Sequence, residues 1–399
     1  MATYAFLNLP ARGHINPTLP IVKELVARGD DVYYFTAEEF KELIESVGAK
    51  FQLLPPLERI GSQDENKFGM IPGDKQIELL PFAMARQSSR TVPQLVETIK
   101  NIQADCLVYN AMSLWARLAE HLLDLPAVEF RPYHAPRKQR SVLGPFTSER
   151  LAALAAAGDR ELEKVASSFE RCPKTLHELV STPAGLTVVF MPREFQFEAE
   201  SFDDRFLFVG PSLFEAPPHP WPFPEDKAEG LLRAYISLGT LRNNDAEFYR
   251  TCFSAFDQRE WQVVMSVGEQ IDRHSLSPSP KNFYVAPSVP QTAILPHVDV
   301  FVTHGGLNSV MESLYFGVPV VVVPSIKEQR LTASRVRELG LGAVLERETL
   351  TPQTLQQHAR SVGCDEETRD RIKTMQSLTR SAGGYKRATE AIVRFAANA

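Results

Sequence analysis

The sequence is poor in cysteine and has no pair of cysteines at the spacing of a metal site. Its four cysteines, Cys106, Cys172, Cys252 and Cys364, are widely scattered, and no CxxC occurs. Without a CxxC pair among so few cysteines, we expect neither metal ligation by cysteine nor a disulfide framework. A reducing cytosol is the simplest setting, so we expect a cytoplasmic protein.

The sequence also lacks a basic excess and any long apolar run. With 43 Lys and Arg against 49 Asp and Glu, the formal net charge is -6. This charge gives no electrostatic basis for binding nucleic acid or an anionic membrane. No segment has the length of a membrane span, and the apolar stretch 4–9 has no cationic segment before it, so we expect no signal peptide.

Two common nucleotide-binding motifs are missing as well. No GxGxxG properly follows a predicted strand, and no GxxxxGK[ST] is present. These absences disfavour a dinucleotide-binding site of the usual kind and a P-loop.

What the sequence does have is a regular alternation of short apolar strands with amphipathic helices. Strands are predicted at Met1–Leu9, Asp31–Thr36 and Cys106–Tyr109, and the alternation resumes with Leu232–Leu238 and Trp261–Ser266. Such alternation predicts an α/β fold with doubly wound parallel sheets. The length of 399 residues suits two domains.

The best candidate for a boundary is a proline-rich segment. Six prolines lie between 211 and 224, and proline fixes φ and removes a backbone donor, which excludes regular helix or central strand. We predict a first domain at 1–210, a linker at 211–226, a second domain at 227–380 and a C-terminal helix at 381–399.

A turn in the second half has the character of an anion-binding site. His304-Gly305-Gly306 lies between a predicted strand, Val300–Thr303, and a predicted helix, Leu307–Phe316. The first N–H groups of a helix have no partner within it, and the helix dipole is positive there, so the turn suits a phosphate. Taken alone, the same residues also fit an ordinary crossover with a solvated turn.

Other polar residues follow predicted strands in the same way. His14 follows the first strand, where a histidine suits a general base but is more often structural. Ser237-Leu238-Gly239-Thr240 ends a strand, where hydroxyls and a glycine can approach phosphate oxygens. There are two further candidate groups. The backbone of Val289-Pro290-Gln291 could form hydrogen bonds with the edge of a nucleotide base, and Glu328-Gln329 offers an acid and an amide that suit vicinal hydroxyls.

Together, and in this order, these motifs resemble the family 1 UDP-glycosyltransferases of GT-B fold, in particular the bacterial macrolide and flavonoid branch. The likeness runs from NLPARGHINPTLPIVKELVARGDDV near the start to HGGLNSVMESLYFGVPVVVVP and the ELGLG at 338–342. It implies two Rossmann-like domains facing a cleft. The first binds the acceptor, the second binds the nucleotide sugar, and the C-terminal helix crosses back to the first.

The resemblance also implies roles for individual residues. His14 would be the general base on the acceptor hydroxyl, oriented by the residue at 110. The diphosphate, ribose and base of the donor would be bound by Ser237, Gly239, Thr240, Val289, Gln291, His304, Gly306, Asn308, Ser309 and Glu312, and its sugar by Glu328 and Gln329.

The sequence departs from the family at two of these positions. Asn110 replaces the usual aspartate, and an amide cannot stabilise a charged imidazolium as a carboxylate does. The dyad is therefore weakened, or another acid helps, or the acceptor needs little activation, as an acidic hydroxyl or an amine would. Glu328 replaces the usual aspartate on the sugar, which leaves the identity of the sugar open.

The resemblance predicts an inverting, metal-independent hexosyltransferase that uses a nucleoside diphosphate sugar, with UDP-glucose the first candidate, and a small, largely apolar acceptor. It predicts no cofactor. The alternatives are a dTDP-deoxysugar-dependent antibiotic glycosyltransferase, a nucleotide-sugar epimerase of the same fold, and a binding partner with impaired catalysis. Candidates for the acceptor pocket wall, each equally compatible with the core, are Phe68, Met70, Phe82, Phe130 and Tyr133.

Overall fold

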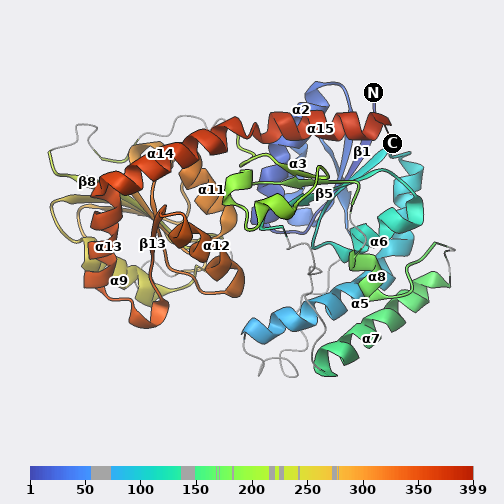
Figure 1. Cartoon of the computed structure of the whole chain (residues 1–399), viewed down its shortest axis with the longest axis horizontal. Coiled ribbons are helices and arrows are strands. Elements are labelled where there is room, and N and C mark those ends of the chain that lie inside the picture. Colours follow the sequence, from blue (N-terminus) through green and yellow to red (C-terminus); the bar gives the residue numbers. More distant parts are fainter. Residues whose placement is uncertain are drawn as a thin grey trace. The chain divides into compact units, whose positions relative to one another are not determined.

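The structure is a computed structural model in which the chain divides into two compact units. One unit comprises Met1–Ser212 with Gly383–Ala399, and the other comprises Leu213–Ala382. The structure describes residues 1–54, 73–135, 149–167, 169, 171–181, 184–214, 221–223, 229–240, 243–271, 276 and 278–398. Each unit is built around its own parallel sheet (Figure 1).

The sheet of the first unit has the strand order β3-β2-β1-β4-β5-β6-β7, and all neighbours are parallel. Its strands are Thr3–Leu7 (β1), Asp31–Thr36 (β2), Lys50–Leu53 (β3), Cys106–Asn110 (β4), Ala127–Arg131 (β5), Leu186–Val189 (β6) and Phe206–Phe208 (β7). Along β1, Tyr4 and Phe6 enter one core cluster whereas Ala5 and Leu7 enter another. Since side chains alternate across a strand, both faces of this sheet are buried.

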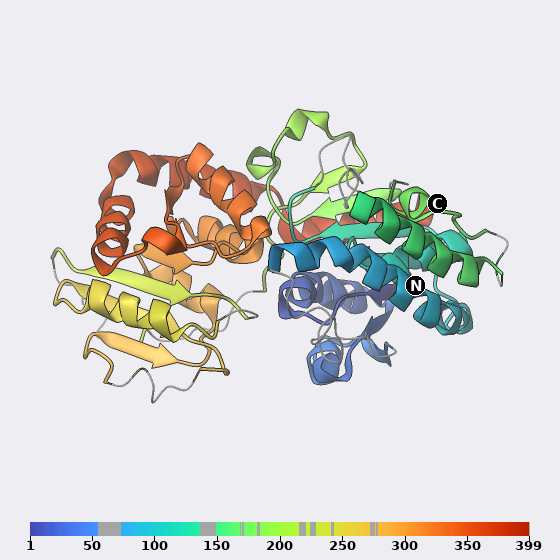
Figure 2. The same cartoon turned by 90° about the horizontal axis from the view of Figure 1, so that it is seen from below.

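Helices supply the other half of each cluster. The helices are Arg12–Ile15 (α1), Leu19–Ala27 (α2), Lys41–Glu45 (α3), Gly73–Asn101 (α5), Leu114–Leu123 (α6), Glu149–Ala166 (α7), Leu176–Ser181 (α8) and Gly384–Asn398 (α15). One face of the sheet is covered by α2, α3 and α15, and the other by α5, α6, α7 and α8. Figure 2 shows α5, in blue, running beside α7, in green.

The sheet of the second unit has the strand order β10-β9-β8-β11-β12-β13, again all parallel. Its strands are Leu232–Ser237 (β8), Trp261–Ser266 (β9), Phe283–Ala286 (β10), Val300–Thr303 (β11), Val320–Val322 (β12) and Gly342–Val344 (β13). Its helices are Ala246–Phe256 (α9), Gln291–Ile294 (α10), Leu307–Phe316 (α11), Lys327–Glu338 (α12), Pro352–Cys364 (α13) and Glu366–Ser381 (α14). A core cluster joins α9 and α13 to this sheet, and α11 packs on α14.

The segment predicted as a linker is described at 211–214 and 221–223. Trp221 packs on the second unit: its indole N–H donates to Gln262 over 3.1 Å, and its ring lies 5.3 Å from the guanidinium of Arg233. This tryptophan therefore anchors the segment to the unit that follows it.

The last helix returns to the first unit. Ala388 and Ile392 of α15 are buried in the cluster that contains α2, and the N–H of Gly384 donates to the carbonyl of Val209 over 2.7 Å. The predicted fold class, two doubly wound α/β domains with a C-terminal helix that crosses back to the first, is confirmed.

Some elements were not predicted. The helices α8, α12 and α13 and the strand β13 have no counterpart in the prediction. In α12 the sequence KEQRLTASRVRE is mostly charged or polar, so it carries a weak apolar stripe. None of the helices that the structure describes combines the length and the apolar character that a bilayer crossing demands.

Replacement of Ile392 tests how strongly α15 is held. Its side chain is 1% exposed, so Ile392→Ala removes buried methyl groups and leaves a cavity. We expect the free energy of unfolding of the first unit to fall by about 2 to 5 kcal/mol, measured by urea unfolding followed by circular dichroism. The control is Glu390→Ala on the exposed side of the same helix, with an expected change within about 0.5 kcal/mol. Equal effects of the two variants would contradict the packing.

Candidate functional site

His14 lies on the short helix α1, directly after β1, rather than in an open loop. Asn8, the residue after that strand, is fully buried, and its amide donates to the carbonyl oxygen of His14 over 2.9 Å. The same amide donates to the hydroxyl of Tyr34 over 2.7 Å. The end of β1 therefore fixes the backbone that carries His14.

The side chain of His14 contacts Asn110, the last residue of β4. The amide nitrogen Nδ2 of Asn110 lies 2.7 Å from Nδ1 of His14. The other end of the same amide, Oδ1, accepts the backbone N–H of Met112 over 2.9 Å. The structure therefore brings together the two residues that the sequence proposed as a dyad.

The surroundings of His14 favour a neutral ring. Burial lowers the pKa of His14 to about 4, although the hydrogen bond with Asn110 opposes the shift. The ring of Tyr133 meets the imidazole edge to face at a centroid distance of 6.3 Å. Tyr133 is half-buried there, so it is the predicted pocket residue that the structure places beside the histidine.

In the second unit, the ends of β8 and β11 form one site. Ser237 and Thr303 are paired in register, so the turns that follow the two strands are neighbours. Gly239 has φ +77°, and a Cβ there would lie 2.6 Å from the ring of His304. Glycine is therefore required by both the backbone conformation and the close approach of the histidine.

The turn after β11 leads into α11, which begins at Leu307. The predicted residues Gly306, Asn308 and Ser309 lie at this helix start and are half-buried. Within the helix, the hydrogen-bond ladder starts only with the N–H of Val310, which donates to the carbonyl of Gly306. The N–H groups before it point out of the helix end, an arrangement that suits an anion.

Two predicted residues from separate elements meet beside this helix. Nε2 of Gln291, the first residue of α10, donates to Oε2 of Glu312 on α11 over 2.7 Å. Burial raises the pKa of Glu312 to about 7 against this hydrogen bond. Val289 is half-buried two residues before Gln291. A carboxyl group is thus held, largely out of water, where the sequence placed a ribose-binding residue.

His304 is also held away from water. Burial lowers its pKa to about 4, opposed by a hydrogen bond to the backbone of Ser237, and the charge of Arg347 lowers it further. Thr240, by contrast, is exposed at the end of its turn.

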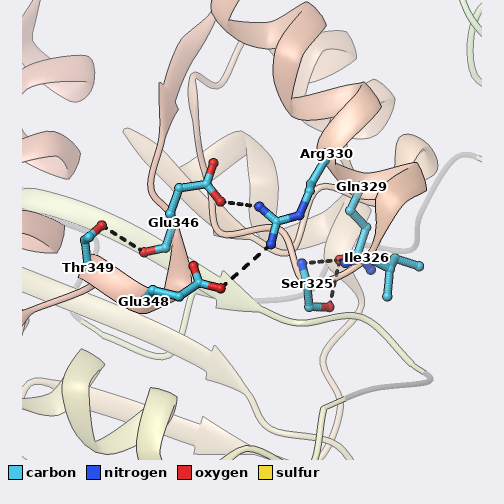
Figure 3. A network of polar contacts seen from close by, with 7 residues as sticks. All are labelled: Ser325, Ile326, Gln329, Arg330, Glu346, Glu348 and Thr349. Carbon is cyan, nitrogen blue, oxygen red and sulfur yellow. Dashed lines mark hydrogen bonds and ion pairs between the residues drawn. The ribbon is translucent and has the colours of Figure 1, made fainter. Parts of the chain in front are cut away.

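The pair Glu328-Gln329 lies at the start of α12, and Figure 3 shows Gln329 with the residues around it. Oε1 of Gln329 accepts the backbone N–H and the hydroxyl of Ser325, over 2.8 and 2.9 Å, and the N–H of Ile326 over 3.3 Å. The amide oxygen of Gln329 therefore holds its own loop, whereas Glu328 is exposed. Figure 3 also shows Arg330, one residue further on, bridging Glu346 and Glu348.

Two polar residues of this site were missed by sequence reasoning. Asn243 donates from Nδ2 to the carbonyl of Gly239 over 2.8 Å, which holds the glycine turn. Arg347 places its charge near His304 and pairs with Asp245. Nothing in the sequence marks either one, because Asn243 belongs to no motif and Arg347 lies in a charged segment that is typical of a solvated surface.

Of the remaining acceptor-pocket candidates, the structure describes the side chain of Phe130. Phe130 is 2% exposed and packs on Phe190 at a ring distance of 6.0 Å, so it is a core residue. Phe68 and Met70 lie outside the described residues, as does the side chain of Phe82. Across the described ranges, no three His, Cys, Asp or Glu side chains are grouped to hold a metal ion. Independence of metal stays a prediction.

Comparison with known proteins places this geometry in a family. Residues 253–382 match the profile of the erythromycin biosynthesis protein CIII-like, C-terminal domain. The chain is 37% identical to the NDP-glycosyltransferase YjiC of Bacillus subtilis (strain 168), over 98% of this chain and 96% of that protein. It is 32% identical to demethyllactenocin mycarosyltransferase of Streptomyces fradiae, over 98% of this chain and 86% of that protein.

A solved glycosyltransferase structure is also similar to this chain. The calicheamicin glycosyltransferase CalG4 superposes with a TM-score of 0.83 at 28% identity, over 100% of this chain and 99% of that chain. The likeness therefore spans both units, including the carboxyl edges of both sheets.

The raised pKa of Glu312 makes a prediction for stability. The folded protein holds this proton more tightly than the unfolded chain, whose carboxyl has its ordinary pKa of 4.5. The contribution of this proton to the free energy of unfolding is present below pH 4.5 and is lost as the pH rises through about 7. Glutamine does not titrate, so Glu312→Gln should not lose this stability as the pH rises. Without ligand at pH 8, the variant should therefore be more stable than the parent by on the order of 2 kcal/mol.

Urea unfolding at pH 5 and pH 8 measures this difference. The matched control is Glu229→Gln, an exposed glutamate of the same unit, for which we expect no such pH-dependent gain. If Glu312→Gln gained no more than the control between the two pH values, the carboxyl would not be held in a desolvated site.

Proposed function

The chain belongs to the family 1 glycosyltransferases of GT-B fold, and we propose that it moves a hexose from a nucleoside diphosphate sugar to a small, largely apolar natural-product acceptor. UDP-glucose is the first candidate donor. The names of the relatives, an NDP-glycosyltransferase and a mycarosyltransferase, support a sugar donor and a natural-product acceptor. Attack from the face opposite the leaving diphosphate inverts the anomeric carbon.

The observation that carries the proposal is the hydrogen bond between Gln291 and Glu312 beside the start of α11. It supports a nucleoside site in which the carboxylate of Glu312 accepts the ribose hydroxyls. Its pKa of about 7 leaves much of the group neutral in the empty site. Ribose hydroxyls that donate to the carboxylate favour its charged form, so binding of the nucleoside and loss of the proton are coupled.

The diphosphate is expected at the turn between β11 and α11. Backbone N–H groups of the helix start can donate to the phosphate oxygens, and Gly239 and Gly306 leave room beside His304. Negative charge grows on the leaving diphosphate as the glycosidic bond breaks. Donors fixed in a site with little water stabilise such charge, and Arg347 adds a positive charge near His304.

The sugar is expected beside the start of α12. The backbone of Gln329 lies close to Gly305, which places Glu328-Gln329 next to the diphosphate turn. Since Oε1 of Gln329 is bonded to its own loop, its Nε2 and the exposed Glu328 are the groups offered to sugar hydroxyls. We propose no cofactor, because the donors above supply the stabilisation of the leaving group that a metal supplies elsewhere.

Product formation with defined donors tests the function. Purified protein is incubated with UDP-glucose or dTDP-glucose and a panel of phenols, alcohols and amines, and release of nucleoside diphosphate is measured together with the glycoside by mass spectrometry. We expect release that depends on both donor and acceptor. The variant His14→Ala should transfer more slowly and keep the dissociation constant for the donor. No release with any pair would contradict the proposal, and sugar isomerisation without acceptor would favour an epimerase.

A ligand-based cycle tests the role of Glu312. If its carboxylate accepts the 2′-hydroxyl, replacing UDP by 2′-deoxy-UDP should weaken binding to the parent protein by about 10- to 100-fold, as expected for a hydrogen bond to a charged group. The same replacement should change binding to Glu312→Ala much less. Calorimetric titration measures the four dissociation constants. The control variant Glu338→Ala lies on the exposed side of α12 and should behave like the parent. If Glu312→Ala bound 2′-deoxy-UDP more weakly than UDP by the same factor as the parent does, the contact would be contradicted.

A further inference from the structure

The backbone N–H of Met112 determines which way the amide of Asn110 faces. A backbone N–H can only donate, so the atom 2.9 Å from it must be the amide oxygen, Oδ1. The amide is planar, and its nitrogen therefore lies on the other side, 2.7 Å from Nδ1 of His14. Hydrogen bonds of the neighbouring backbone fix this arrangement. The carbonyl of Asn110 accepts from the N–H of Ser113 over 2.8 Å, and the N–H of Ala111 donates to the carbonyl of Phe130 over 3.2 Å.

This orientation decides the tautomer of His14. Nδ2 of an amide is a donor only, so Nδ1 of the imidazole has to accept and cannot carry a proton. A neutral imidazole carries one proton, which must then be on Nε2. An aspartate at the same position would accept from Nδ1–H and leave Nε2 free to take a proton, so the asparagine produces the opposite tautomer.

Among the residues that the structure describes, no other group corrects this arrangement. Within the described part of the chain, no hydrogen bond or ion pair joins His14 to a carboxylate. Of the described residues, Asn110 contacts the imidazole through its amide and Tyr133 through its ring, and the guanidinium of Arg131 lies 5.8 Å from the centroid of that ring. The carboxylate of Glu129, on β5, is paired with Arg117 and Arg131. Protonation of both ring nitrogens is opposed by burial.

We propose that His14 presents an Nε2–H donor to the acceptor and does not remove its proton, so that the protein glycosylates acidic phenols and enols whose oxygen is already ionised. The inference rests on the proposed function for the reaction itself. Asn110 is the positioning residue in this scheme, since it acts only through His14. Nε2 makes no hydrogen bond to the described residues, and His14 is half-buried, so this nitrogen is the one left for a ligand.

The reaction balances without a proton acceptor on the protein. The phenol loses its proton to water before it binds, and Nε2–H of His14 donates a hydrogen bond to the phenolate oxygen. A lone pair of that oxygen forms the new bond to the anomeric carbon. The bond from that carbon to the diphosphate oxygen breaks, and its electron pair leaves with the nucleoside diphosphate. The proton on Nε2 stays on His14 throughout.

The tautomer is measured without any turnover. Nitrogen-15 NMR of protein labelled at histidine, with His14→Ala to assign the signals, distinguishes a protonated from an unprotonated ring nitrogen. We expect a protonated Nε2 and an unprotonated Nδ1 in the parent, and the reverse in Asn110→Asp. A protonated Nδ1 in the parent would overturn the inference even if transfer were observed.

The acceptor class is measured with phenols of matched size and graded acidity, together with a benzyl alcohol and an aniline. In the parent, kcat/KM should rise with pH only up to the pKa of each phenol, so that the inflection moves with the acceptor. In Asn110→Asp, where His14 can accept the proton, the inflection in the pH profile of kcat/KM should lie at the same pH for all acceptors. Transfer to the weakly acidic hydroxyls should rise about 100- to 10,000-fold, the usual range for general base catalysis.

A gain of activity cannot result from misfolding, which makes Asn110→Asp the informative variant. The matched control is Asn101→Asp, an exposed residue at the end of α5 that adds the same charge and should behave like the parent. Efficient transfer to benzyl alcohol by the parent, an inflection that is the same for all phenols, or preferential transfer to the aniline would each overturn the proposal. Absence of turnover in every variant would count against the proposed function instead, while the tautomer remains measurable.

Discussion

The direction of one hydrogen bond, from the N–H of Met112 to the side chain of Asn110, constrains the chemistry of the first unit. The bond belongs to a tight turn at the end of β4, where the strand ends at the carboxyl edge of a parallel sheet. Such edges are where open α/β sheets bind ligands, because loops from several strands converge there. The fold thus puts His14 and Asn110 together, and the turn decides which of them donates.

In the second unit the comparable constraint is burial of polar groups beside a helix start. Glu312 and His304 both have pKa values shifted by burial toward their neutral forms. Holding such groups away from water destabilises the empty protein, because their charged forms are less well solvated than in the unfolded chain. A bound nucleoside diphosphate would supply the missing partners, hydroxyls for the carboxyl and phosphate oxygens for the imidazole. Under the proposed function, the arrangement is that of a site preorganised for its ligand rather than for stability.

Much of the fold followed from the sequence because buried parallel strands are continuous apolar runs. The strands Asp31–Thr36 and Trp261–Ser266 and the helix Leu307–Phe316 were predicted with the bounds that the structure gives. The amphipathic signal fails where a helix is mostly charged, as in α12, and there the prediction missed the element. α13 was missed although Thr351 and Pro352 form a regular helix start, because its apolar residues are few.

The turns of the candidate site could be predicted because they combine glycine, histidine and hydroxyl residues after strands. The contacts within it could not. That Gln291 reaches Glu312 depends on how α10 lies beside α11, and the role of Arg347 depends on a segment distant in sequence. The sequence marked Asn110 as unusual and left its effect open among three alternatives. Our proposal selects among them on the position of a backbone N–H, which no sequence pattern reports.

The two units therefore contribute unequally to the proposed reaction. In this proposal the second unit offers backbone N–H groups, a half-buried histidine and an arginine to the leaving diphosphate, and all of them act more strongly as the charge on it grows. The first unit offers the acceptor a hydrogen-bond donor, which orients an anion but cannot make one. Since rate enhancement comes only from interactions that strengthen in the transition state, most of it must arise at the leaving group. The chemistry of nucleophile activation then passes from the protein to the acceptor, whose own acidity sets which hydroxyl reacts.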